Sequence, residues 1–265
     1  MTTTTINGTS INYADTGGDG RPVVLLHAFP LNSGQWEQQV DALSGRFRLI
    51  VPDLKGFGGS DAPEDASSYS MDDYADSVAG LLDELGVQRV TLVGLSMGGY
   101  IAFAFLRRHR DRVEALVLAD TRAEADPPEG KEKRSKQQEM VRGEGTSGLI
   151  DALTGALISE ATLNSKPDVV DRLRKLMDNP PAGFVGGLEA MKTRPDSSGE
   201  LSAIDVPTLV VVGEKDGVTP PDAARTIHNG VGNSEMIVIP GVGHLSNLEA
   251  PEDFTAALEK FLSAL

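Results

Sequence analysis

Short apolar runs alternate along this chain with longer segments of helical period, and this alternation restricts the possible folds more than any other feature. The runs are rich in Val, Leu and Ile, which predicts strands buried on both faces. Such strands, separated by helices, build a mostly parallel sheet flanked by helices, an α/β fold. The expected strands are Val23–His27, Arg48–Pro52, Arg89–Leu95, Val113–Ala119, Thr208–Gly213 and Glu235–Ile239, with a further strand at Ser10–Asp15 as an antiparallel edge.

The strand pattern is interrupted in the middle of the chain. Between residues 122 and 202, charged segments of helical period replace it, separated by glycines and prolines. Because strand character returns at Val206, we expect a helical cap at 122–202 inserted into one core domain formed by 1–121 and 203–265. The cap has an apolar helical face that either roofs a substrate pocket or only joins the cap helices: Leu149, Ile150, Leu153, Leu157 and Ile158.

The strongest motif is Gly94-Leu95-Ser96-Met97-Gly98-Gly99, at the end of an expected strand and directly before an expected helix. A strand-to-helix turn this sharp requires glycine beside the central residue, because side chains there would collide. It would raise Ser96 above the sheet as a nucleophile. A serine hydroxyl needs an adjacent base and donors for the developing oxyanion, so the rest of the chain has to supply both.

The base is sought among only 4 histidines. His244 follows Pro240-Gly241-Val242-Gly243 in a loop after the last expected strand, and it is the best candidate. His109 and His228 are interpreted as surface residues at helix ends. An acid that orients the base should follow a strand and precede the histidine, which favours Asp216 after Thr208–Gly213 and leaves Asp120 as the rival.

The order Ser96, Asp216, His244 resembles the α/β-hydrolase superfamily, and the resemblance covers nearly the whole chain. Further matches are His27-Ala28-Phe29-Pro30 and Asp53-Leu54-Lys55-Gly56-Phe57-Gly58-Gly59-Ser60, each after a strand. The resemblance implies a catalytic triad of Ser96, Asp216 and His244 and an oxyanion hole made by the backbone N–H groups of Phe29 and Met97. The chain departs from the family at Ala28, where glycine is usual, and His27 is expected to organise its loop.

The net charge and the absence of cysteine limit the classes of partner and ligand that we expect for this protein. The formal net charge of −15 repels phosphate backbones and anionic lipid headgroups, so we expect neither nucleic acid nor a membrane as partner. With no cysteine, a thiolate nucleophile and a cysteine-ligated metal are excluded, and we expect no cofactor and no metal. The N-terminus has neither the basic start nor the apolar run of a secretory signal, which predicts a cytoplasmic protein. Oligomeric state is not indicated.

Several activities remain open at this point. A serine nucleophile argues against the haloalkane dehalogenase and epoxide hydrolase branches, which depend on aspartate. The motifs look similar to small bacterial carboxylesterases, enol-lactonases and cofactor-free haloperoxidase-type perhydrolases. We expect a serine hydrolase that cleaves small to medium carboxylic esters through an acyl-enzyme. Lactone opening or perhydrolysis on the same triad is the alternative, and a non-catalytic small-molecule receptor is the alternative from another class.

Overall fold

An eight-stranded sheet forms the centre of the protein, in a computed structural model that describes residues 1–265. Its strands are β1 (Thr2–Ile6), β2 (Thr9–Asp15), β3 (Pro22–Leu26), β4 (Arg48–Pro52), β5 (Val90–Leu95), β6 (Val113–Ala119), β7 (Thr208–Gly213) and β8 (Ser234–Ile239). They are ordered β1-β2-β4-β3-β5-β6-β7-β8 across the sheet. The pairs β1–β2 and β2–β4 are antiparallel and the others are parallel, so the expected mostly parallel α/β sheet is confirmed.

Strand β1 was not predicted, and it makes the expectation for Ser10–Asp15 partly wrong. Those residues lie in β2, which is antiparallel to β4 as expected, but β1 pairs along its other side and forms the edge. Asn7 and Gly8 join β1 to β2 with φ of 50° and 80°, the conformation that a tight hairpin turn between twisted strands requires. A run of β-branched residues, Thr2–Ile6, directly before Asn7-Gly8 is the signal for this hairpin.

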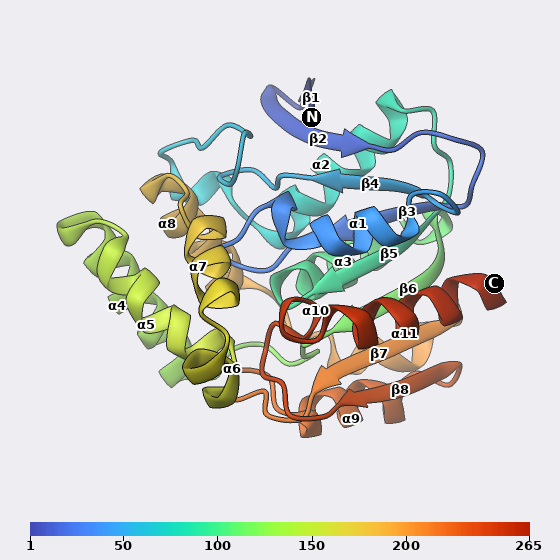
Figure 1. Ribbon diagram of the computed structural model, residues 1–265. Helices are drawn as coiled ribbons and strands as arrows, with labels where there is room; N and C mark the ends of the chain where they lie inside the picture. The colour runs from blue at the N-terminus through green and yellow to red at the C-terminus, as the bar shows by residue number, and fades with distance from the viewer.

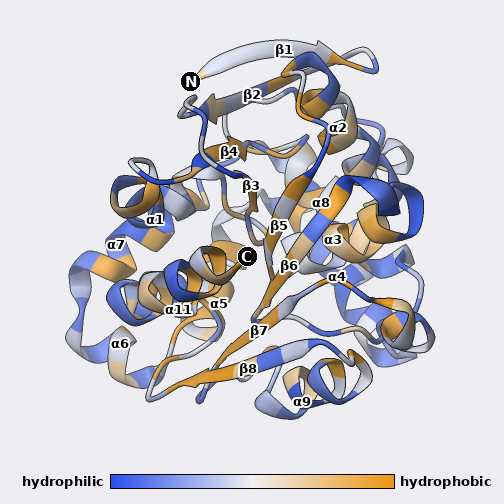
Figure 2. Ribbon diagram, turned by 90° about the vertical axis from the view of Figure 1, so that its right-hand side faces the viewer, coloured by the Kyte–Doolittle hydropathy of each residue, from blue (hydrophilic) through white to orange (hydrophobic).

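Helices cover both faces of the sheet. Outside residues 122–202 they are η1 (Ser33–Trp36), α1 (Glu37–Leu43), η2 (Ala66–Ser68), α2 (Met71–Glu84), α3 (Met97–Arg108), η3 (Arg110–Arg112), α9 (Pro221–Gly230), α10 (Ser246–Glu249) and α11 (Pro251–Ala264). Figure 2 shows α1 and α11 on one side of the sheet and α2, α3 and α9 on the other.

The two helical layers explain why the strands are continuously apolar. In β3, Val23 and Leu25 pack into the core that contains residues of α1 and α11, whereas Val24 and Leu26 pack into the core that contains residues of α2 and α3. Successive side chains of a strand point to opposite faces, so both sets have to be hydrophobic. Figure 2 shows the same property as apolar colour along the central strands.

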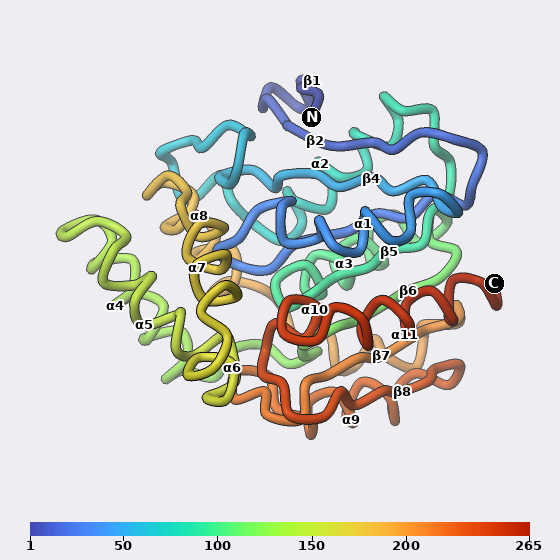
Figure 3. Tube along the Cα trace, in the orientation of Figure 1, coloured from blue at the N-terminus to red at the C-terminus, as the bar shows by residue number.

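The chain leaves the sheet after β6 and returns at β7. The helices between them are α4 (Pro128–Glu144), α5 (Ser147–Leu157), α6 (Glu160–Ser165), α7 (Pro167–Leu176), α8 (Pro181–Thr193) and η4 (Ser198–Ala203). Figures 1 and 3 show α4 to α8 together beyond one end of the strands. No helix in the structure combines the length and the apolar character needed to cross a membrane.

Candidate active site

A sharp turn between β5 and α3 carries Ser96. The backbone of Ser96 has φ 55° and ψ −111°, a conformation that L-residues rarely adopt and that occurs at functional sites. A Cβ atom on Gly94 would lie 2.3 Å from the Gly98 carbonyl oxygen, and one on Gly98 would lie 2.2 Å from the Leu26 carbonyl oxygen. Both contacts are with backbone that cannot rotate away, so any other residue at these two positions would strain the turn.

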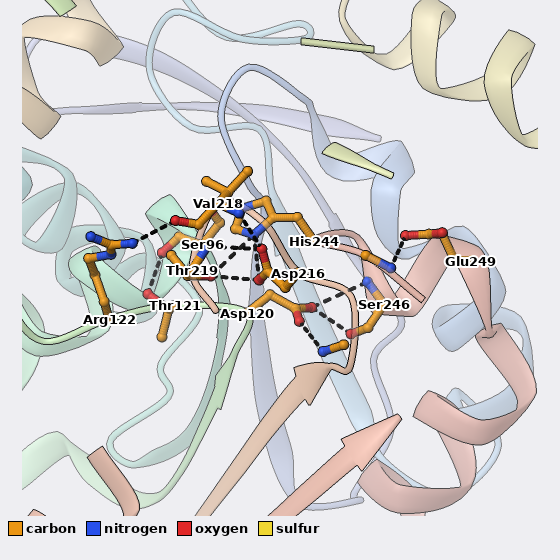
Figure 4. Close-up of polar contacts among 12 residues, drawn as sticks. Ser96, Asp120, Thr121, Arg122, Asp216, Val218, Thr219, His244, Ser246 and Glu249 are labelled. Atoms are coloured by element: carbon orange, nitrogen blue, oxygen red, sulfur yellow. Dashed lines mark hydrogen bonds and ion pairs between the residues drawn. The ribbon is translucent and has the colours of Figure 1, made fainter. Parts of the chain in front are cut away.

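Ser96, His244 and Asp216 meet at the carboxyl end of the sheet, although they lie far apart in sequence. Ser96 follows β5, Asp216 follows β7 and His244 follows β8, and loops at this end of a parallel sheet converge. Ser96 Oγ is 2.8 Å from His244 Nε2, and His244 Nδ1 is 2.8 Å from Asp216 Oδ2 (Figure 4). Their exposed fractions are 7%, 1% and 3% for Ser96, His244 and Asp216, so the contacts are shielded from bulk water.

Thr219, which sequence reasoning missed, fixes the acid and the tautomer of the base. Its hydroxyl donates to Asp216 Oδ2 at 2.7 Å, and the hydroxyl oxygen, Thr219 Oγ1, lies 3.2 Å from His244 Nδ1. Asp216 Oδ1 accepts the backbone N–H groups of Val218 and Thr219 at 2.8 and 2.9 Å. Two acceptor oxygens therefore face His244 Nδ1, which places the ring proton there and leaves Nε2 free to accept from Ser96. An aspartate whose side chain caps the turn that follows it is the only sequence signal for this arrangement.

The charges of His244 and Asp216 stabilise each other. Burial acts to lower the pKa of His244, but the charge and hydrogen bond of Asp216 outweigh it, so the pKa lies above its ordinary value of 6.5. Burial acts to raise the pKa of Asp216, but the charge of His244 and the bonds from His244 and Thr219 outweigh it and lower the pKa. Asp216 is thus ionised, and its charge would stabilise a protonated imidazole at His244.

Asp120, the rival acid, lies close by but makes no hydrogen bond to His244. Its carboxylate accepts the N–H of Gly213 at 2.8 Å and the hydroxyl of Ser246 at 2.5 Å. Burial, followed by the negative charge of Asp216, raises the pKa of Asp120 to about 7. Asp120 therefore joins the end of β7 to the segment after His244, and the geometry favours Asp216 as the orienting acid.

The loop that carries His244 is also attached to the helical segment. Glu249, which the sequence analysis did not single out, is buried and accepts the N–H of Gly243 at 2.7 Å and both the N–H and the hydroxyl of Ser159 at 2.9 and 2.6 Å. One carboxylate thus fixes the residue before His244 to the start of α6. No spacing rule in the sequence indicates this contact, because it joins residues from two separate segments.

The remaining histidines have other partners. His27 Nε2 accepts the N–H of Leu54 at 3.0 Å, while Nδ1 lies 3.0 Å from the Ala28 carbonyl oxygen. Burial lowers the pKa of His27 to about 4, so its ring is neutral and positions the loop, as expected. His109 contacts Asp76 at 2.8 Å and His228 contacts Ser234 at 2.8 Å. Both are partly exposed and lie at helix ends, in agreement with their interpretation as surface residues.

The amides expected at the oxyanion hole belong to Met97, which follows Ser96 in the chain, and to Phe29, which lines the same cavity as Ser96. Met97 begins α3, and the first N–H groups of a helix have no acceptor within the helix. The N–H of Phe29 donates no hydrogen bond in the structure, and the Phe29 side chain lines the same cavity as Ser96 and His244. The preceding residue, Ala28, is buried and donates its N–H to Gln35 Oε1 at 2.8 Å, so alanine fits the loop at this position.

A cavity of about 310 Å³ opens above Ser96 and His244. Of the expected apolar cap face, Leu153 and Leu157 line this cavity. Leu149 and Ile158 are instead buried members of the two hydrophobic cores, one in each, and Ile150 packs against both cores. Only part of the expected face therefore lines the cavity above the serine.

Comparisons with known proteins agree with the fold and the motifs. Residues 21–251 match the family model described as alpha/beta hydrolase fold. The structure superposes on an esterase from Thermogutta terrifontis (malate bound) with a TM-score of 0.93 and 40% identity over 99% of this chain and 96% of that chain. It superposes on the enol-lactonase from Burkholderia xenovorans LB400 with a TM-score of 0.92 and 29% identity over 99% and 100% of the two chains.

A curated relative extends this similarity. The AB hydrolase superfamily protein YisY of Bacillus subtilis is 32% identical over 259 residues, which are 94% of this chain and 94% of that protein. The family match, the sheet order and the serine turn all lead to one assignment: the chain belongs to the α/β-hydrolase fold family.

Proposed function

We propose that this protein is a serine hydrolase that cleaves small to medium carboxylic esters through an acyl-enzyme. The observation that carries the proposal is the continuous chain of contacts from Ser96 Oγ through His244 to Asp216, with 2.8 Å at each step. The names of the relatives, esterase and enol-lactonase, support a hydrolase that acts on ester bonds.

In the first half of the reaction, Ser96 Oγ attacks the ester carbonyl carbon while His244 Nε2 accepts the hydroxyl proton. The carbonyl oxygen becomes an oxyanion, which the N–H groups of Phe29 and Met97 stabilise. His244 then donates its proton to the leaving alcohol, and the acyl group remains on Ser96. In the second half, His244 takes a proton from water, the resulting hydroxide attacks the acyl carbon, and the acid leaves as Ser96 regains its proton.

The helical segment has a separate part in this proposal. We infer that residues 122–202 form a cap over a core of residues 1–121 and 203–265. Leu153 and Leu157 from the cap and Phe29 from the core line the cavity above Ser96, so an acyl chain can bind between them. Lactone opening and perhydrolysis use the same nucleophile. Of these two alternative reactions, the enol-lactonase relatives favour lactone opening.

A fluorophosphonate probe tests the nucleophile directly. We expect the wild-type protein to be labelled, Ser96→Ala to be unlabelled, and Ser165→Ala, which changes an exposed serine on α6, to be labelled as the wild type is. Turnover of p-nitrophenyl esters should fall by about 10⁴ to 10⁶ in Ser96→Ala. Folded wild-type protein that neither labels nor hydrolyses any ester would favour the receptor alternative, and faster turnover of a lactone than of open-chain esters would favour a lactonase.

A further inference from the structure

The cavity above Ser96 carries an excess of positive charge that ester hydrolysis by itself does not require. Arg122, Lys133 and Arg134 line it, whereas Asp126 is the only acidic residue among its lining residues. Asp126 is already paired with Arg134 and with Arg194, whose Nη2 lies 2.9 Å from it. Arg122 and Lys133 are therefore left without a counter-charge, in a protein whose formal net charge is −15.

Arg122 is unusual among the arginines of this chain. Apart from Arg142, every other arginine lies within ion-pair distance of a carboxylate. Arg122 instead donates from Nη2 to the Val218 carbonyl oxygen at 2.6 Å. A guanidinium has five N–H donors in a planar fork, so one such bond leaves donors for a ligand.

The backbone before Arg122 is attached to the nucleophile turn. Thr121 donates its hydroxyl to the Ser96 carbonyl oxygen at 2.9 Å, and Figure 4 shows Arg122 directed toward Val218 beside Ser96 and Thr121. Lys133 reaches the cavity from α4 and is exposed, so it lies at the solvent side of the cavity. Arg122 is thus the first residue of the segment 122–202, directly after the sheet, and Lys133 lies further along the same segment on α4.

We propose that the cavity selects esters of short-chain acids that carry a second, ionised carboxylate, which Arg122 and Lys133 recognise. This inference rests on the proposed function, because the reacting ester has to lie at Ser96. The carboxylate binds the free N–H groups of Arg122, and the intervening methylene groups pack on Leu153 and Leu157. Such a substrate supplies the counter-charge that the two cations lack, and its methylene groups contact the uncharged residues that line the cavity.

A pair of esters of equal chain length tests this selectivity. The probes are the mono-p-nitrophenyl ester of glutaric acid, which is anionic, and p-nitrophenyl pentanoate, which is neutral, with spontaneous hydrolysis subtracted. We expect wild-type kcat/KM to be higher for the anionic ester by about tenfold or more, as a charge-assisted hydrogen bond provides. Raising the salt concentration from about 0.02 to 0.5 M should reduce this preference, because salt screens partly exposed charges.

Single substitutions test which residues cause the preference for the anionic ester. Arg122→Gln should lower kcat/KM for the anionic ester by about 10- to 100-fold and for the neutral ester by less than about threefold. Arg122→Lys should keep part of the preference, because it keeps the charge without the fork. Lys133→Gln should cost about two- to fivefold on the anionic ester only, since Lys133 is exposed. Arg142→Gln is the matched control, an exposed and unpaired arginine that does not line the cavity, and it should change neither ester.

Three outcomes would overturn the inference. Equal losses on both esters in Arg122→Gln would mean that Arg122 only supports the Val218 loop. A wild-type protein that hydrolyses the neutral ester without preferring the anionic one, at low salt, would refute the selectivity and leave the proposed function intact. Absence of turnover of both esters, together with absence of fluorophosphonate labelling, would refute the proposed function and this inference with it.

Discussion

Replacing Asp216 by asparagine should move the ring proton of His244 from Nδ1 to Nε2, although asparagine has nearly the same shape as aspartate. Asp216 Oδ1 accepts two backbone N–H groups, from Val218 and Thr219, so the amide oxygen of the variant has to stay in that place. The amide NH2 then faces His244 Nδ1, where Asp216 Oδ2 now lies at 2.8 Å. A donor at this position favours the tautomer with its proton on Nε2, which cannot accept the proton of Ser96.

The expected magnitude follows from the loss of this tautomer. The same reversal in serine proteases costs about 10⁴ in kcat, which corresponds to about 5 kcal/mol of transition-state stabilisation at 1.36 kcal/mol per tenfold. The assay is kcat for a p-nitrophenyl ester near neutral pH, with thermal unfolding of the variant as the check on folding. The two backbone bonds persist in the variant, so its Tm should stay close to that of the wild type.

Asp120→Asn is the matched control for Asp216→Asn. It makes the same chemical change in a neighbouring buried carboxyl that is hydrogen-bonded to Gly213 and Ser246 and not to His244. We expect kcat to fall by less than about tenfold. If Asp120→Asn were as damaging as Asp216→Asn, or if Asp216→Asn kept more than about a tenth of the wild-type kcat, the tautomer argument would be refuted.

Two further perturbations test the base and the turn. The pKa of His244 lies above 6.5, since Asp216 outweighs the effect of burial, and the neutral ring is the active form, so kcat/KM should rise with pH through a midpoint above 6.5. A flat profile, or a midpoint well below 6.5, would contradict this. Gly98→Ala would place a Cβ atom 2.2 Å from the Leu26 carbonyl oxygen and should lower the free energy of unfolding in urea by about 1–3 kcal/mol. Gly143→Ala, where the added Cβ meets nothing within 4 Å, should be neutral or slightly stabilising, and equal stabilities of the two variants would refute the packing argument.

The sheet was largely predictable, because each central strand is buried on both faces and therefore has a continuous apolar sequence. The strand expected at Val23–His27 is observed at Pro22–Leu26, and the one expected at Glu235–Ile239 begins one residue earlier. Strand β1 escaped prediction because it is an edge strand with mostly exposed threonines, which lack that apolar pattern. Its signal was the turn at Asn7-Gly8 and not the strand itself.

The sequence by itself determined which residue types the site contains and the order in which they occur. Gly94, Ser96 and Gly98 form a local motif, and its chemistry can be inferred wherever a strand meets a helix. Asp216 and His244 follow recognisable strands, so the parallel sheet predicts that they converge near Ser96.

Only the tertiary structure shows that Asp216, and not Asp120, is hydrogen-bonded to His244, because both follow strands at the same end of the sheet. The choice depends on which oxygen lies within hydrogen-bond distance of His244 Nδ1, and that distance is set by the twist of the sheet and the packing of the loops. The same holds for Thr219, Glu249 and Arg122, which carry no motif. Their positions at the site result from contacts between distant segments, and such contacts depend on the folded path of the chain and not on local spacing.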